Sequence, residues 1–261
     1  MRADRYLFEF GHVQSRQRAK QLIEEGNVTV DGRCIGKPSY EIDETASHTV
    51  SVTDTQRYVS RGGLKLEGAL DAFGLDVTDV RALDIGASTG GFTDCLLQRG
   101  AKFVTAVDAG EGQLARKLCE DARVRSLEHF NARNIQLTDI GGETVGLIVM
   151  DVSFISATYI IPRFFDLLDD GGDAICLIKP QFEVGRSMLG KGGIVKDAAA
   201  HRIAIERVLQ SAGASGLVPL SLIPSPIKGG DGNREFLVHL KKTDAECVPL
   251  TEVDIRRIVG N

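Results

Sequence analysis

The chain has 261 residues, of which 43% are hydrophobic and 26% are charged. This length and composition exclude a disordered chain and allow one full hydrophobic core beside a smaller second module. The 36 acidic residues outnumber the 31 basic ones and give a net charge of −5, so general attraction to nucleic acid or to an anionic membrane is not the expected behaviour. Any site for a polyanion must therefore be a limited region in which basic residues are concentrated.

The cysteines, histidines and apolar runs indicate a cytoplasmic protein. The five cysteines include no Cys-x-x-Cys pair, which is typical of reduced thiols rather than of disulfides or a zinc ribbon. The five histidines show no metal-ligand spacing, so we expect no metal. No apolar run approaches the ~18 residues that a membrane span needs, and the N-terminus lacks the apolar segment of a secretory signal. We expect no contact with a membrane.

The first 57 residues predict a small helix-helix-hairpin domain. Residues 2–11 and 15–26 have the spacing of two short helices, with a serine N-cap and a glycine end on the second. Residues 28–35 alternate around an Asp-Gly turn, which predicts a hairpin. Residues 44–60 are polar with two alternating valines and predict a strand and a linker, so we place the domain boundary near residue 58.

The string from Ser15 to Arg33, SRQRAKQLIEEGNVTVDGR, resembles the RNA-binding domain named after ribosomal protein S4. The resemblance implies that the second helix and the hairpin bind structured RNA. Up to residue 59 the chain has 8 basic and 9 acidic residues, so this domain is not basic as a whole, and any RNA contact depends on where its few positive charges lie. Solvated helix-face charges are the alternative, but the shared glycine, valine and Asp-Gly spacing favours RNA. The predicted RNA-binding residues of this domain are Arg5, Arg16, Arg18, Lys20 and Arg33.

From residue 58 to residue 261, apolar strands alternate with helical stretches. This alternation predicts an α/β, Rossmann-like fold with a mostly parallel seven-stranded sheet covered on both faces. The last two strands are joined by a loop rich in proline and glycine, which suits an antiparallel hairpin. The predicted strands are 81–85, 103–107, 124–127, 147–150, 174–178, 217–223 and 235–240.

A glycine-rich turn, DIGASTGGFTD at 84–94, follows the first of these strands and opens a helix. Asp108 ends the next strand, where a carboxylate can accept both hydroxyls of a ribose. A dinucleotide enzyme would show Gly-x-Gly-x-x-Gly and bind a pyrophosphate, but Asp84 would repel phosphate. S-adenosylmethionine is cationic and has no phosphate, so acidic residues at both positions favour it over NAD. Helix-capping carboxylates are the structural alternative, and they account less readily for the paired glycines at 90 and 91.

Further along the chain, Asn131 can reach the adenine side of the cofactor or act only as a turn residue. The predicted cofactor-binding residues are Asp84, Gly86, Ala87, Ser88, Thr89, Gly90, Gly91, Phe92, Asp108, Asn131 and Asp151.

Charged residues also follow two later strands. Asp151 and Lys179 end apolar runs, and a lysine in that position is costly unless it is paired, so we expect the two to meet. Lys65 lies before the first strand of the sheet, and Glu235 begins the last strand. The sequence therefore predicts a cluster of two lysines and two carboxylates.

Residues 58 to 240 resemble the FtsJ-type ribosomal RNA 2′-O-methyltransferases, whose Lys-Asp-Lys-Glu tetrad maps onto Lys65, Asp151, Lys179 and Glu235. With the N-terminal module and the strings SRGGLK, DIGASTGGFT, NAR, DVSFIS, KPQFE and GNREF, the whole chain resembles the TlyA family, whose members are often labelled hemolysins. The resemblance implies a class I methyltransferase fold and 2′-O-methylation of a cytidine in ribosomal RNA of the large subunit, in some members also of the small one. Ribosomal subunits are the implied partners, and we expect a monomer.

For that reaction we predict Lys179 as the general base, Lys65 as the group that holds the attacking oxygen, and Asp151 as a bridge to the methionine end of the cofactor. DVSF also echoes the Asp-Pro-Pro-Tyr/Phe loop of enzymes that methylate base nitrogens, but those would not need the tetrad. Phe154 can stack on a splayed base or belong to the core.

Residues 179–202 have an excess of three positive charges in a glycine-rich segment, which predicts an RNA-contacting flap or else a solvated loop. Two other functions stay open. A membrane-active hemolysin would need an insertion segment and an export route, and the sequence shows neither; an RNA-binding assembly factor would keep the fold without turnover. The RNA-binding residues predicted outside the first domain are Arg61, Phe154, Arg186 and Lys191.

Overall fold

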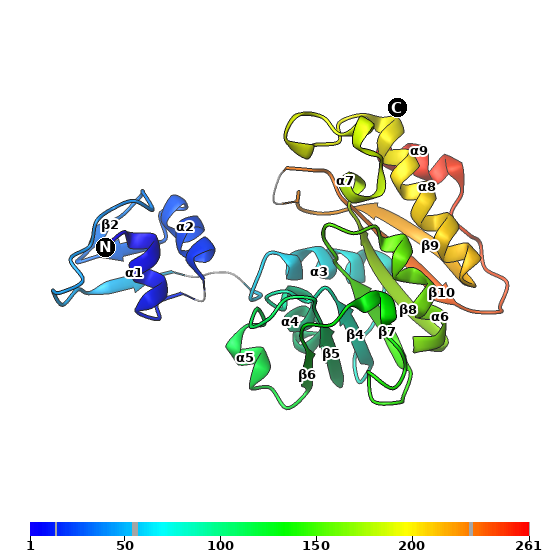
Figure 1. Ribbon diagram of the computed structural model, residues 1–261, viewed down its shortest axis with the longest axis horizontal. Coiled ribbons are helices and arrows are strands. Elements are labelled where there is room, and N and C mark those ends of the chain that lie inside the picture. The colour runs from blue at the N-terminus through cyan, green and yellow to red at the C-terminus, as the bar shows by residue number, and fades with distance from the viewer. Residues whose placement is uncertain (14, 54–56, 230–231, 261) are drawn as a thin grey trace. The chain divides into compact units, whose positions relative to one another are not determined.

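The computed structural model describes residues 1–13, 15–53, 57–229 and 232–260. The chain divides into two compact units, Met1–Arg57 and Tyr58–Asn261 (Figure 1).

The N-terminal unit confirms the predicted helices and hairpin. The Ser15 side chain accepts a hydrogen bond from the backbone N–H of Arg18, so serine caps the second helix as expected. Leu7, Leu22 and Ile23 are fully buried in a small core. The strand predicted within 44–60 is present, whereas linker residues 54–56 lie outside the described residues. The elements are α1 (Ala3–Glu9), α2 (Arg16–Glu24) and an antiparallel sheet, in the order β2-β1-β3, of β1 (Val28–Val30), β2 (Arg33–Cys34) and β3 (Val50–Val52).

The second unit is built on a seven-stranded sheet with the order β6-β5-β4-β7-β8-β10-β9. Strands β4 to β8 are parallel, and β10 runs antiparallel to both of its neighbours, so the predicted Rossmann-like sheet and its final antiparallel pair are confirmed. β8 begins six residues earlier than predicted, because Leu168 already pairs with Val145, although the residues between Leu168 and Ala174 are polar or glycine. The strands are β4 (Arg81–Ile85), β5 (Phe103–Val107), β6 (Val124–Leu127), β7 (Val145–Met150), β8 (Leu168–Ile178), β9 (Leu217–Pro224) and β10 (Phe236–Lys242).

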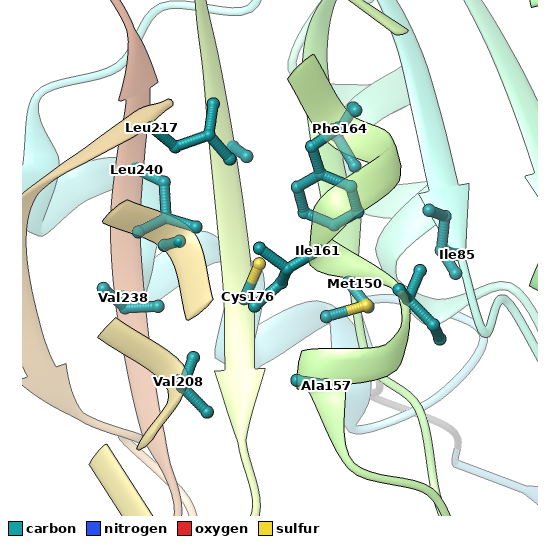
Figure 2. Close-up of a cluster of buried hydrophobic side chains, with 14 of the residues drawn as sticks. Ile85, Met150, Ala157, Ile161, Phe164, Cys176, Val208, Leu217, Val238 and Leu240 are labelled. Carbon is teal, nitrogen blue, oxygen red and sulfur yellow. The ribbon is translucent and has the colours of Figure 1, made fainter. Parts of the chain in front are cut away.

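Helices cover both faces of this sheet. One hydrophobic cluster packs α3 (Gly62–Phe73), α4 (Gly91–Gln98) and α5 (Arg116–Cys119) against one face. The other cluster, part of which is drawn in Figure 2, packs α6 (Phe164–Leu167), α8 (Ala198–Ala214) and α9 (Glu252–Val259) against the opposite face. Among the described residues, no helix is both long enough and apolar enough to cross a membrane. Shorter elements are α7 (Pro180–Glu183) and the 3-10 turns η1 (Ala132–Asn134), η2 (Ala157–Tyr159), η3 (Ile161–Arg163), η4 (Arg186–Met188) and η5 (Lys191–Gly193).

Strand β7 shows why the central strands read as continuous apolar runs. Leu147 and Val149 belong to the first cluster, whereas Ile148 and Met150 belong to the second. Successive side chains of a strand point to opposite faces, so a strand covered on both sides needs apolar residues at every position. The first polar residue after such a strand lies at the edge of the sheet, where the carboxyl ends of β4, β7 and β8 meet.

Candidate active site

The turn after β4 depends on glycine at its first position. Gly86 has a φ of +83°, and a Cβ there would lie 2.5 Å from the backbone oxygen of Asp151. Only glycine therefore lets the turn pass the end of β7 at this distance. The N–H groups of Gly86 and Ala87 both donate to the Val107 carbonyl, at 2.8 and 3.1 Å. These two hydrogen bonds attach the turn to the end of β5.

A cavity of about 450 Å³ opens beside this turn. Of the predicted cofactor residues it is lined by Gly86, Ser88, Asp108, Asn131 and Asp151. Its wall also contains residues that the sequence reasoning did not assign to the cofactor, among them Ala109, Gln113, Phe130, Val152, Ser153, Phe154 and Ile155.

Asp108 and Asn131 are both held in place by backbone groups. The two carboxylate oxygens of Asp108 accept hydrogen bonds from the N–H groups of Ser88 and Gly110, at 2.8 and 2.7 Å. Each oxygen keeps a further lone pair, which is what a pair of ribose hydroxyls requires. Asn131 accepts a hydrogen bond from the Arg133 N–H and so starts η1, which means that it is a turn residue and a cavity residue at the same time.

Asp84 lies behind the cavity wall rather than in it. It is completely buried, and the Thr93 hydroxyl donates to one carboxylate oxygen at 2.6 Å, while the other oxygen has no hydrogen-bond partner among the described residues. Burial raises the pKa of Asp84 to about 7; the Thr93 hydrogen bond opposes this rise, and the Asp151 carboxylate adds to it. The structure therefore places Asp84 behind the cavity lining, where it can act on a cofactor only through the residues in front of it.

Five more residues of the predicted cofactor set are absent from the cavity lining, because the turn buries them or directs them elsewhere. Phe92, for example, is 3% exposed and packs in the hydrophobic cluster of α3 and α4. Gly90 has a φ of +93°, and a Cβ there would lie 2.2 Å from the Leu118 side chain, so this glycine serves packing against α5. The five residues are Ala87, Thr89, Gly90, Gly91 and Phe92.

The donor set of the turn fits S-adenosylmethionine better than a dinucleotide. A pyrophosphate needs free N–H groups at the helix N-terminus. Here the N–H groups of Gly86 and Ala87 donate to Val107, that of Ser88 donates to Asp108, and that of Gly90 donates to Ala87. Asp108 and Asp151 instead leave two acidic groups in the lining, which suit a ribose and a cationic methionine end.

The four residues of the predicted charged cluster lie together. Lys179 Nζ is 2.6 Å from Asp151 Oδ1, and Lys65 Nζ is 2.6 Å from Glu235 Oε2 and 3.9 Å from Asp151 Oδ2. Lys65 is 8% and Glu235 3% exposed, so this pair is buried. The register explains the meeting, because Phe236 pairs with Ile178 and brings the preceding Glu235 beside the end of β8. Two cations and two anions leave the cluster neutral.

Beside the cluster, the loop after β7 exposes an aromatic ring. Phe154 is 92% exposed, and its φ of +64° is rare for a residue with a side chain. Its ring centroid lies 5.2 Å from that of Phe182. The core alternative for Phe154 is therefore wrong. Ser153, whose hydroxyl accepts a hydrogen bond from Lys179 Nζ at 2.7 Å, and Phe182 were not predicted as site residues, although both lie in the strings DVSFIS and KPQFE.

The predicted RNA-binding residues differ in how free their charges are. Arg5 pairs with Glu9 at 2.7 Å, and Arg16 pairs with the buried Asp4 at 2.8 Å, so both cations are partly neutralised within their own unit. Arg18 is likewise engaged in a contact. The predicted cations that are exposed at the surface are Arg5, Arg16, Lys20, Arg33, Arg61, Arg186 and Lys191.

Among the described residues, no group of three or more potential ligands is placed to hold a metal.

Known families and proteins match almost the whole chain. Residues 58–242 match the FtsJ-like methyltransferase family, and residues 1–47 match the S4 domain. A Mycobacterium tuberculosis protein named 16S/23S rRNA (cytidine-2′-O)-methyltransferase TlyA is 43% identical over 92% of this chain and 89% of its own length. A Campylobacter jejuni protein named 23S rRNA (cytidine-2′-O)-methyltransferase TlyA is 31% identical over 87% of this chain and 94% of its own. A solved structure from Streptococcus thermophilus that carries the name hemolysin has a TM-score of 0.79 and 43% identity, covering 99% of this chain and 94% of that one.

Proposed function

The chain belongs to the FtsJ-like methyltransferase family and carries an S4 domain, and on that premise we propose that it methylates the 2′-hydroxyl of a cytidine ribose in ribosomal RNA, with S-adenosylmethionine as donor. The observation that carries the proposal is the neutral cluster of Lys65, Asp151, Lys179 and Glu235 beside the cavity. An enzyme that methylates a base nitrogen has no evident need for two lysines there. We infer that the protein acts in the cytoplasm, where ribosomal subunits are found.

The cavity residues supply the cofactor site in this proposal. Asp108 holds the ribose, Asn131 lies on the adenine side, and Asp151 faces the methionine end. When bound, S-adenosylmethionine supplies a methyl group that its sulfonium already activates. The protein therefore has two remaining tasks, which are to align the ribose hydroxyl and to take its proton.

Lys179 is the proposed general base. Asp151 and Ser153 hold its Nζ at 2.6 and 2.7 Å, so the nitrogen has a fixed position at the end of β8. In its neutral form the amine accepts the hydroxyl proton while the new O–CH₃ bond forms and the S–CH₃ bond breaks. Lys65 stays cationic beside Glu235 and stabilises the negative charge that develops on the oxygen.

The RNA contacts come from both units. The S4 domain binds a folded part of the ribosomal RNA with the exposed charges of Lys20 and Arg33. Phe154 stacks on the base of the target nucleotide once that base leaves its helix, and the flap cations Arg186 and Lys191 contact the backbone. We propose the large subunit as the principal substrate and the small subunit as a second one.

The test is methyl transfer to purified ribosomal subunits. Wild-type protein is mixed with radiolabelled S-adenosylmethionine and large subunits, small subunits or naked rRNA, and the modified nucleotide is mapped by mass spectrometry. We expect 2′-O-methylcytidine from the wild type and none from Lys179→Ala, with cofactor binding retained. Cofactor binding without transfer to any substrate would refute the proposal in favour of an assembly factor. Release of dye from liposomes by the pure protein would favour a hemolysin instead.

A further inference from the structure

Glu183 is a buried carboxylate next to the active site to which the proposed reaction gives no task. It ends α7, four residues after Lys179, and is 2% exposed. Its Oε2 accepts a hydrogen bond from the Ser156 hydroxyl at 2.5 Å, and its Oε1 accepts one from the Ala157 N–H at 2.8 Å. The Arg207 guanidinium reaches the backbone carbonyl of Glu183 rather than its carboxylate. Both carboxylate oxygens are thus used by a single loop, the one that follows β7.

That loop, residues 151–157, is joined to the segment after β8 at three further places. Asp151 pairs with Lys179, Ser153 accepts a hydrogen bond from Lys179, and Phe154 packs against Phe182. These three contacts involve the reactive groups or the surface of the site, because Lys179 takes part in two of them and Phe154 is 92% exposed. Among these contacts, the one through Glu183 is the most deeply buried. It is therefore the one that can hold the loop when the other three rearrange around a substrate.

The backbone of this loop needs such support. Phe154 has a φ of +64°, a conformation that is unfavourable for a residue with a side chain and persists only where the surroundings impose it. The two hydrogen bonds of Glu183 fix the chain two and three residues further on. A loop released at Ser156 and Ala157 is free to return Phe154 to ordinary backbone angles and to turn its ring away.

We propose that Glu183 is a positioning residue for the target nucleotide, which holds residues 156 and 157 so that Phe154 is presented to the base and Ser153 stays on Lys179. This inference rests on the proposed function. Burial raises the pKa of Glu183, with the Ser156 and Ala157 hydrogen bonds acting in the opposite sense. The role needs two hydrogen bonds to the loop rather than the charge, so a glutamine is expected to fill it.

The experiment compares Glu183→Ala, which removes both hydrogen bonds, with Glu183→Gln. The glutamine oxygen can accept from the Ala157 N–H, and its NH₂ group can donate to the Ser156 oxygen. Asp173→Ala is the matched control, because Asp173 is also a largely buried carboxylate with two partners, His239 and Lys241, yet lies about 20 Å along β8 from Lys179. We expect kcat/KM for ribosomal RNA to fall about tenfold in Glu183→Ala, mostly through KM, and to stay within about twofold of wild type in Glu183→Gln and Asp173→Ala.

Two readouts separate positioning from a general loss of stability. Kinetic effects of Glu183→Ala and Phe154→Ala should not multiply in the double variant, because both act through the same ring. Hydrogen exchange of residues 152–160, measured without substrate, should be faster in Glu183→Ala and unchanged in Glu183→Gln. Multiplying effects, unchanged exchange, or an equal loss of activity in Asp173→Ala would each overturn the inference. Failure of the proposed function would look different from all of these outcomes. The wild type itself would then leave ribosomal RNA unmethylated, while hydrogen exchange of residues 152–160 would still be faster in Glu183→Ala than in Glu183→Gln.

Discussion

Replacing Glu235 by glutamine should separate the stability of the charged cluster from its chemistry. Lys65 is 8% exposed and has two carboxylates near it, Glu235 at 2.6 Å and Asp151 at 3.9 Å. Loss of the nearer one leaves a buried ammonium with only the distant partner, and the neutral cluster gains a net charge of +1. Breaking a buried pair from one side costs about 3 to 5 kcal/mol. Because Asp151 remains, we expect the lower end, a loss of about 3 kcal/mol in the free energy of unfolding.

The double variant Lys65→Met/Glu235→Leu restores neutrality with apolar groups of similar length and should recover most of that loss. Urea unfolding followed by far-UV circular dichroism is the suitable assay, because the chain has no tryptophan. Methyl transfer to ribosomal RNA should be lost in the double variant although its stability returns. A loss below 1 kcal/mol in Glu235→Gln, or a double variant no more stable than the sum of the two single ones, would refute the view that the pair is kept for function at a cost in stability.

Three further outcomes follow from other residues. Burial raises the pKa of Asp84 to about 7 from an ordinary value of 3.8, so the folded protein binds a proton at Asp84 more tightly than the unfolded chain does. The free energy of unfolding of the wild type should therefore fall by about 3 to 4 kcal/mol as the pH rises from 4 to above 7. Asp84→Asn should lack this decline, and an equal dependence of unfolding free energy on pH in the variant and the wild type would contradict the assignment. Phe154→Ala should leave stability within about 0.5 kcal/mol because the ring is exposed, yet raise KM for ribosomal RNA about tenfold, as steady-state kinetics can check. Lys20→Gln should lower the slope of log affinity for ribosomal RNA against log salt by about 1, whereas Lys102→Gln, an exposed lysine before β5, should not; equal slopes would argue against the S4 domain as the RNA contact.

The parts of the fold that could be predicted are those fixed by local patterns. Alternation of apolar strands and helices was sufficient for the sheet, and the serine cap and the Asp-Gly turn were sufficient for the N-terminal unit. The beginning of β8 was missed because Leu168 pairs with Val145 ahead of a polar stretch, and no periodicity within the segment reports that contact. The presence of a strand can be predicted from its own residues, whereas its length depends on the strand that it pairs with.

The candidate site was predictable at the ends of strands and much less so in its turns. Asp108, Asp151 and Lys179 each follow an apolar run, so their position at one sheet edge could be worked out in advance. The glycine-rich turn was assigned to the cofactor as a block, but packing decides which of its residues face the cavity: Phe92 turns into the core and Asp84 stays behind the wall. Side-chain direction within a turn depends on contacts that are distant in sequence.

Three departures from ordinary folding rules lie close together in the second unit. Asp84 is a buried carboxylate with an oxygen that no described group satisfies, and Phe154 combines an exposed ring with a left-handed backbone. The pair of Lys65 and Glu235 is a buried charge pair that apolar residues could replace with little loss. Each feature is unfavourable for stability on its own, and all lie at or next to the carboxyl ends of β4, β7 and β8. Sequences retain such features where function requires them, so the energetics of this edge point to the active site independently of any resemblance to known proteins.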